Sequence, residues 1–329
     1  MTRVAARGRE RMEADETPDE PRVEVRFPRH RLPPARRMSG QERRWLNPHH
    51  GLIKVFERCI DRWVSRHVYP HLFGIWSPYS WQLPRRLCVA EATLSPVPWP
   101  AGLPPLRVLL ITDLHVGPFL LPEVLAPLLD ELMRLEPDLV VVSGDLISGR
   151  AHDLHGFLAG LTVLTRAPLG AWFCMGNHEY FSPDPFYVVD QLLSIGVHTL
   201  RNHAVRLEHG GVGFVLGGLD DLVLGAPDWD RLLAAAGPPH LLLAHNPDAF
   251  YEAERRGVGL VLSGHTHAGQ IRVPGGPPLV RQSQFCLDEG VMSFGSSLLV
   301  VSRGMGASGL PWRFGARPEA VLLTLQPTR

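Results

Sequence analysis

Five short polar clusters hold the residues of this sequence whose types and spacing could do chemistry. In chain order they are TDLH, SGD, GNHE, AHN and GHTH, and each follows an apolar run. Their candidate side chains are Asp113, His115, Asp145, Asn177, His178, Glu179, His245, His265 and His267. One histidine after a strand is usually an ordinary loop residue, but five successive clusters offer only oxygen and imidazole donors. Such donors favour divalent ions such as Mn, Fe or Zn.

Seven of these side chains are too many donors for one tetrahedral ion, and they fit two ions that share a ligand. They are Asp113, His115, Asp145, Asn177, His245, His265 and His267. Two divalent ions are therefore the predicted cofactors.

The apolar runs and the segments between them predict the elements that position these clusters. Buried-strand runs at 106–112 and 139–145 alternate with helical patterns at 122–135, 152–166 and 185–195. Beyond residue 200 short strands dominate, with helical patches near 228–236 and 247–255. This order predicts an α/β fold, a two-sheet β-sandwich flanked by helices. Loops at the carboxyl ends of such strands converge, so the clusters are expected to meet there.

The five clusters, in this order, resemble the motifs of the calcineurin-like metallophosphoesterase superfamily, from about residue 106 to the C-terminus. The ending RGMGASGLPWRFGARPEAVLLTL is also similar to a bacterial branch of membrane-associated phosphodiesterases. The resemblance implies one ion held by Asp113, His115, Asp145 and His267. It implies a second ion held by Asp145, Asn177, His245 and His265, with Asp145 bridging.

The same resemblance implies hydrolysis of a phosphodiester or pyrophosphate bond by a hydroxide that bridges the two ions. Ions about 3.5–4 Å apart lower the pKa of such a water and hold the attacking and leaving oxygens. His178 is not needed as a ligand and is the predicted catalytic residue, stabilising the transition state or protonating the leaving oxygen. Glu179 either orients His178 or caps the next segment. Arg201, Asn202, Arg303 and Arg313 are candidates for phosphate contacts or are ordinary structural residues.

Composition places the chain among ordinary globular proteins. It has 329 residues, 45% of them hydrophobic and 20% charged, and no net charge. Zero net charge and the lack of a basic stripe disfavour a nucleic-acid partner. Four cysteines without CxxC spacing fit a reducing compartment, so the expected location is cytoplasmic.

The N-terminal third divides by composition into two segments before the domain at 106–329. Residues 1–40 are charged, rich in proline and predicted to be disordered; residues 41–105 comprise an amphipathic helix and a Pro-rich connector. Leu52, Phe56, Ile60 and Trp63 define the apolar face of that helix, opposite a basic face. It either packs on the domain or gives peripheral contact with the inner membrane face through residues 51–76.

Three functional hypotheses follow. The first is a phosphoesterase acting on a soluble phosphodiester. The second is a UDP-2,3-diacylglucosamine-type lipid pyrophosphatase at the membrane surface, which the amphipathic helix and the aromatic residues Trp63, Trp76, Tyr79 and Trp81 favour. The third is a non-catalytic scaffold, which is disfavoured because His178 and all seven donors are present.

Overall fold

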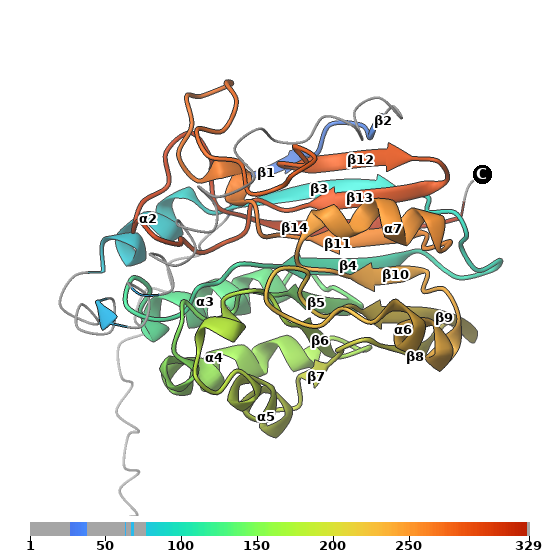
Figure 1. Cartoon of the computed structure of the whole chain (residues 1–329), viewed down its shortest axis with the longest axis horizontal. Helices are drawn as coiled ribbons and strands as arrows, with labels where there is room; N and C mark the ends of the chain where they lie inside the picture. Colours follow the sequence, from blue (N-terminus) through green and yellow to red (C-terminus); the bar gives the residue numbers. More distant parts are fainter. Residues whose placement is uncertain (1–26, 38–62, 64–66, 69–76, 328–329) are drawn as a thin grey trace, which may run out of the picture.

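The computed structural model describes residues 27–37, 63, 67–68 and 77–327. Two mixed seven-stranded sheets pack face to face, and helices lie on their outer faces (Figure 1). The two-sheet sandwich with flanking helices expected from the sequence is thereby confirmed.

The first sheet contains the strands of the strand–helix half of the chain and the last strand. Its spatial order is β1 (Arg29–Arg31), β3 (Cys88–Leu94), β14 (Glu319–Leu325), β4 (Leu106–Ile111), β5 (Leu139–Ser143), β6 (Ala171–Cys174) and β7 (His198–Thr199). Strands β4 to β7 are parallel, whereas β14 runs antiparallel to β4 and parallel to β3. The carboxyl ends of β4, β5 and β6 therefore share one edge.

The second sheet has the order β2 (Arg36–Arg37), β12 (Gly290–Phe294), β13 (Ser297–Val301), β11 (Leu260–Ser263), β10 (Leu241–Leu243), β9 (Val212–Gly218) and β8 (His203–His209). Strands β9, β10, β11 and β13 are parallel, and β8 and β12 pair antiparallel at their flanks. This sheet therefore also presents several carboxyl ends along one edge.

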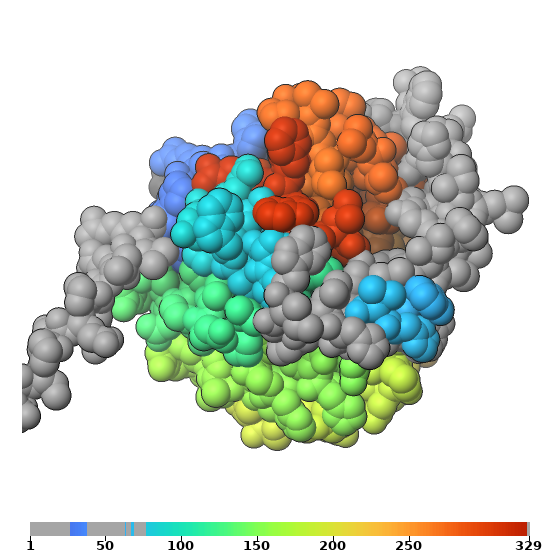
Figure 2. Space-filling view, turned by 90° about the vertical axis from the view of Figure 1, so that its left-hand side faces the viewer, coloured from blue at the N-terminus to red at the C-terminus, as the bar shows by residue number. Residues whose placement is uncertain are grey.

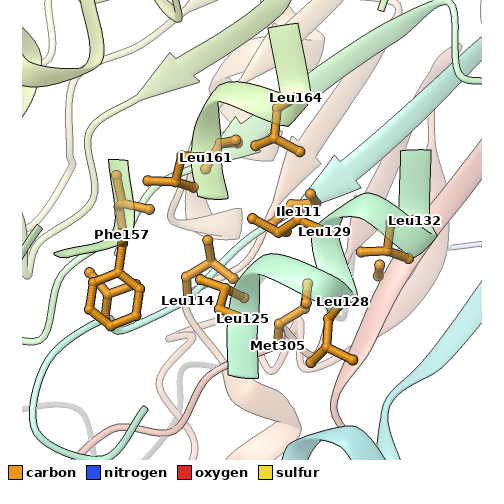
Figure 3. Packing of buried hydrophobic residues seen from close by; sticks show 14 of the residues in the cluster. Ile111, Leu114, Leu125, Leu128, Leu129, Leu132, Phe157, Leu161, Leu164 and Met305 are labelled. Carbon is orange, nitrogen blue, oxygen red and sulfur yellow. The ribbon is translucent and has the colours of Figure 1, made fainter. Parts of the chain in front are cut away.

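Three hydrophobic layers hold these elements together. Successive side chains of β4 alternate: Val108 and Leu110 pack between the sheets, whereas Leu109 and Ile111 face outward. The outward residues meet α3 (Pro122–Met133) and α4 (Leu158–Leu161) (Figure 3). Helix α5 (Phe186–Ser194) adds Val188 and Leu192 to the same cluster. Helices α6 (Trp229–Ala236) and α7 (Phe250–Arg255) cover the second sheet. Their apolar stripes are what the 3.6-residue periodicity predicted.

One predicted helix differs from the structure. The segment expected to be helical over 152–166 is instead a 3₁₀ helix, η3 (Ala151–Phe157), the single turn α4, and a second 3₁₀ helix, η4 (Thr162–Arg166). Gly156 and Gly160 lower its helix propensity. A Cβ at Gly160 would also press on Ala126 of α3, so close packing explains that glycine.

The sheets use residues upstream of the expected domain boundary at 106. Strand β3 and helix α2 (Pro78–Arg86) lie in the segment expected to be a connector, and β1 and β2 lie within the tail expected to be disordered. β3 pairs with β14 over seven residues, because its apolar side chains complete the core. The amphipathic helix predicted within 51–76 lies outside the described residues apart from Trp63, His67 and Val68.

Among the helices formed by the described residues, none is both long and apolar enough to cross a membrane.

Candidate metal centre

The five polar clusters meet at the edge where β4, β5 and β6 of one sheet face β10 and β11 of the other. Asp113 and His115 follow β4, and Asp145 follows β5. His178 lies in the loop after β6, and His245 lies in the loop after β10. The ends of the two sheets thus bring together titratable side chains that form overlapping groups: Asp113 with His115 and His267, His115 with Asp145 and His178, and Asp145 with His245 and His265.

Left-handed backbone at the strand ends turns these side chains into the site. Asp113, His115, Asp145, His265 and His267 all have positive φ, between 46° and 70°. Residues with a Cβ adopt this conformation at a cost of about 1–2 kcal/mol each. Such strain persists only where surrounding contacts enforce it, and it clusters at functional sites.

Two glycines permit close approach of the loops. A Cβ at Gly264 would overlap the Asp113 carboxylate and the Thr112 hydroxyl, so the loop after β11 packs directly on the end of β4. A Cβ at Gly176 would overlap the Asp145 carboxylate and crowd the His245 ring. Because glycine has no Cβ, Gly264 and Gly176 allow this approach, which any other residue would block.

The first group joins Asp113, His115 and His267. The Nε2 atoms of His115 and His267 are 3.0 Å apart, and His267 Nε2 lies 3.3 Å from Asp113 Oδ1. Asp113 is fully buried and also accepts hydrogen bonds from Thr112 Oγ1 and from the His265 backbone. Two imidazole nitrogens and a carboxylate therefore point at one small volume.

The second group joins Asp145, His245 and His265. His245 Nε2 lies 3.1 Å from Asp145 Oδ2 and 3.3 Å from His265 Nδ1. The Ser143 carbonyl accepts from His245 Nδ1 at 2.8 Å, which leaves Nε2 directed into the site. A backbone carbonyl on the other ring nitrogen is the usual arrangement for a metal-bound histidine.

Asp145 lies between the groups, since its Oδ2 is also 3.8 Å from His115 Nε2. Asn177 is buried, and its Oδ1 has no hydrogen-bond partner in the described structure. A buried, unsatisfied amide oxygen costs about 1–3 kcal/mol unless it binds something. The preceding residue, Gly176, packs closely against Asp145 and His245.

The charges at the site suit cations. Burial opposes charge on Asp113 and Asp145, yet the adjacent histidines hold both carboxyl pKa values well below their ordinary range. Burial lowers the pKa of His115, and together with the His245 charge it lowers that of His265 to about 3. Burial likewise disfavours charge on His245, but Asp145 and Asp113 outweigh it and raise the pKa to about 10. Ionised carboxylates and neutral imidazoles are the forms that bind metal ions, so the carboxylates, His115 and His265 are ready to bind, whereas His245 has to release a proton when an ion binds.

These observations fit a pair of divalent ions. Converging imidazole nitrogens, two buried carboxylates and the unsatisfied Asn177 oxygen supply nitrogen and oxygen donors to two adjacent positions. His267 lies in one of these groups and His265 in the other. The assignment of individual ligands stays a prediction.

His178 lies beside both groups, and with His115 and Asp145 it forms a third candidate group that overlaps them. Its ring packs edge-on against the His115 ring with centroids 4.5 Å apart. The Ser148 carbonyl accepts from His178 Nδ1 at 2.7 Å, and Ser308 Oγ is 3.3 Å from Nε2. Ser148 and Ser308 were not identified from the sequence. Serines are common in loops and in glycine-rich stretches such as the one after β13, so residue type alone does not mark either as a contact of His178.

Glu179 has a role different from both sequence-based alternatives. Its buried carboxylate accepts hydrogen bonds from the backbone N–H groups of Asp145, Leu146, Ile147 and Gly176. Burial, and then the Asp145 charge, raises the pKa of Glu179 to about 7. Glu179 therefore ties the loop after β5 to the loop after β6 and fixes the backbone of Asp145.

Arg313 contacts a candidate ligand and not solvent. It is buried, its Nη2 donates to His267 Nδ1 at 2.8 Å, and its Nε donates to the Gly306 carbonyl. This contact turns His267 Nε2 toward Asp113 and His115.

The other three candidates for phosphate contacts have structural partners. Arg201 pairs with Asp220, and Arg303 pairs with Glu319. Asn202 binds the Ala226 carbonyl and the backbone N–H of Asp220. All three side chains therefore have structural partners, and contact of any of them with a phosphate stays a prediction.

Comparison with known proteins gives consistent matches. The family model described as calcineurin-like phosphoesterase matches residues 106–269. YkuE of Bacillus subtilis, named an uncharacterized metallophosphoesterase, is 30% identical over 74% of this chain and 87% of that protein. A Bos taurus protein named transmembrane protein with metallophosphoesterase domain is 33% identical over 69% of this chain, but this chain covers only 54% of it. A Helicobacter pylori strain J99 protein, named an uncharacterized metallophosphoesterase, is 34% identical over 68% of this chain and 60% of that protein.

Proposed function

This chain belongs to the calcineurin-like phosphoesterase family and is a metal-dependent phosphoric ester hydrolase; from that premise we propose that it hydrolyses a phosphodiester or pyrophosphate bond at the site described above. The observation that carries the proposal is Asp145, whose carboxylate faces His245 on one side and His115 on the other. One carboxylate between two histidine groups is what two adjacent ions require as a shared ligand.

Two divalent ions bound there would supply Lewis acidity, lowering the pKa of a water and neutralising charge on the phosphoryl oxygens. Asp113, His115, Asp145 and His267 would hold one ion. Asp145, Asn177, His245 and His265 would hold the other; Mn, Fe and Zn all accept such donors.

The chain's own acid–base group would be His178. Because the Ser148 carbonyl accepts from Nδ1, it fixes the ring and supports a cationic imidazolium whose Nε2 carries a second proton. That proton can pass to the leaving oxygen as the bond to phosphorus breaks. Ser308, on the far side of Nε2, limits rotation of the ring. Glu179 and Arg313 would act by positioning, through Asp145 and His267 respectively.

The proposal is tested with bis-p-nitrophenyl phosphate, a soluble phosphodiester. The purified chain is expected to hydrolyse it after addition of Mn²⁺, to lose activity on exhaustive chelation and to regain it when metal is restored. Full activity after chelation, verified by metal analysis, would show that hydrolysis does not depend on these ions.

A second candidate substrate is a lipid-linked pyrophosphate of the UDP-2,3-diacylglucosamine type. Leu310, Trp312 and Phe314 expose large apolar side chains on the segment that also carries Ser308 and Arg313. Such side chains beside the site suit a substrate with acyl chains. Turnover of a UDP-linked lipid in detergent, at a kcat/KM above that for the soluble diester, would favour this candidate.

We further propose a cytoplasmic location with peripheral contact at the inner membrane face. The support is the amphipathic pattern within residues 51–76, which lies mostly outside the described residues. The relevant test is fractionation of cells expressing the full chain, followed by a salt wash of the membrane fraction.

A further inference from the structure

Exposed apolar side chains gather beside the candidate metal centre. The described residues include eleven exposed large apolar side chains, and seven of them lie on three segments at this end of the molecule. The seven, which we call the rim patch, are Trp81, Val273, Leu279, Val280, Leu310, Trp312 and Phe314. Singly exposed apolar residues are ordinary, but a cluster marks an interaction surface.

Hydrogen bonds join the three segments into one surface. Arg272 N donates to the Phe314 carbonyl at 2.9 Å, and Phe314 N donates to the Gln270 carbonyl at 3.0 Å. The Gln82 side chain of α2 bonds both backbone groups of Arg313, at 2.8 and 3.0 Å. In Figure 2, α2 (cyan), the segment around 270–285 (orange) and the segment around 305–315 (red) adjoin on one face. The apolar side chains are therefore carried by a fixed framework.

The rim patch borders the site itself. Gln270 Nε2 donates to the carbonyls of Ser308 and Leu310. Ser308 Oγ lies 3.3 Å from His178 Nε2, and Arg313, between Trp312 and Phe314, holds His267. Whatever covers the patch therefore lies next to the residues that contact His178 and His267.

The segments that carry the patch have only positive charges. Residues 77–90, 264–287 and 290–318 contain no Asp or Glu, although the whole chain has zero net charge. Their arginines are Arg85, Arg86, Arg272, Arg281, Arg303, Arg313 and Arg317. Arg272, Arg281 and Arg303 pair with Glu289, Asp288 and Glu319, and Arg313 is buried, which leaves Arg85, Arg86 and Arg317 as the excess positive charge. Arg85 lies over the Trp81 ring, 4.5 Å from its centroid.

We propose that the rim patch docks on a lipid surface bearing anionic headgroups. Tryptophan and phenylalanine enter the interfacial region of a bilayer, while arginines beside them meet the headgroup phosphates. A second copy of the chain fits less well: a two-fold contact would set this positive face against itself. Docking here places the segment that carries Ser308, and with it the side of the site next to His178, close to the membrane. The proposal concerns binding alone and does not depend on which phosphate ester is hydrolysed.

The test is co-sedimentation of the full chain with vesicles of phosphatidylcholine and phosphatidylglycerol in equal parts. The variant Val273→Ser/Leu279→Ser changes side chains that are 64% and 69% exposed. The matched control, Val97→Ser/Leu193→Ser, makes the same replacements where the side chains are 49% and 51% exposed, outside the patch. Both variants leave residues 51–76 unchanged, so any difference between them belongs to the patch.

We expect the patch variant to lose vesicle partitioning by about tenfold or more and the control to bind as the parent chain does. Pure phosphatidylcholine vesicles and high salt should weaken binding of the parent, because part of the attraction is screened electrostatics. All three proteins should melt alike and hydrolyse the soluble diester alike, which separates this test from that of the hydrolytic function.

Equal vesicle binding by both variants would overturn the proposal, as would a parent chain that ignores anionic vesicles. Sedimentation velocity tests the alternative that a second copy of the chain covers the patch. A parent dimer that Val273→Ser/Leu279→Ser converts to monomer, with vesicle binding unchanged, would assign the patch to a second copy.

Discussion

The Asp145 carboxylate contacts residues of both histidine groups. Oδ2 faces His245 Nε2 and His115 Nε2, while Oδ1 accepts from the His178 backbone N–H at 2.8 Å. No other carboxylate among the described residues belongs to two of the candidate metal groups. Removing this side chain therefore acts on both ion positions together, whereas removing one histidine acts on one.

The parent chain is expected to hold two ions, and Asp145→Ala is expected to hold close to none. His265→Ala, which alters one group, should keep about one ion. Metal per chain is measured by inductively coupled plasma mass spectrometry after gel filtration, with exposed Asp190→Ala as the control. Two ions retained by Asp145→Ala would refute its bridging role.

His178→Ala is expected to keep both ions and to lose about 10²–10⁴-fold in kcat on the soluble diester, the usual effect of losing a positioned proton donor. Its metal content and its steady-state rates are measured together, beside His203→Ala, an exposed histidine on β8. If metal is lost along with activity, His178 is a ligand, which its place near His115 and Asp145 also permits.

Sequence reasoning identified the types and order of the residues that converge, because chemistry limits which side chains follow each strand. It did not identify what holds them. Arg313 was considered for phosphate binding, yet it is buried and bonds His267, 46 positions away in sequence. An isolated arginine carries no sign of its partner, since that depends on how the segment after β13 folds back over β4.

At the scale of elements, Glu179 joins two loops that carry site residues. One carboxylate accepts from four backbone N–H groups, three in the loop after β5 and one after β6. A glutamine in its place would direct an amide NH₂ at one or more of those donors. The loop after β5 would then lose its anchor while the strands themselves stayed intact.

Glu179→Gln is expected to lower the free energy of unfolding by about 1–3 kcal/mol, the cost of leaving buried donors unsatisfied. It should also weaken metal binding, because Asp145 loses its fixed backbone. Urea denaturation and chelator competition measure the two effects, with exposed Glu123→Gln of α3 as the control. Unchanged stability and metal affinity would mean that the loop is held in another way.

The elements with strong periodicity were predicted well, and the short or edge elements were not. Helices α3, α5 and α6 fall within the ranges expected from their apolar stripes. Strand β12 was missed because Gly290 to Phe294 pairs at the flank of the second sheet, with only Val291 and Met292 buried. Strand β3 was missed because the prolines that follow it suggested a connector.

At the scale of the whole molecule, β3 joins the N-terminal third of the chain to the sandwich. Its seven pairs with β14 cover an edge that would otherwise expose unpaired backbone. The Pro-rich segment after it is therefore not a boundary at which the chain divides into independent parts.

A chain that starts at Pro98 is expected to aggregate or fail to fold, because it lacks β3. A chain that starts at Ser77 keeps α2 and β3 and, of the described strands, loses only the short β1 and β2, so it should stay folded and hydrolyse the soluble diester. Gel filtration and thermal melting compare the two. A stable, active chain starting at Pro98 would show that β3 is dispensable.

The position of β14 has a consequence for how the protein is made. This last strand inserts between β3 and β4, so 231 positions separate paired residues such as Cys88 and Glu319. All seven candidate ligands are synthesised by residue 267, yet the sheet that carries three of the clusters cannot close until residues 319–325 leave the ribosome. A nascent chain that has reached residue 267 thus contains every candidate donor before the strand that completes their sheet is made, so we expect metal loading to follow the synthesis of β14.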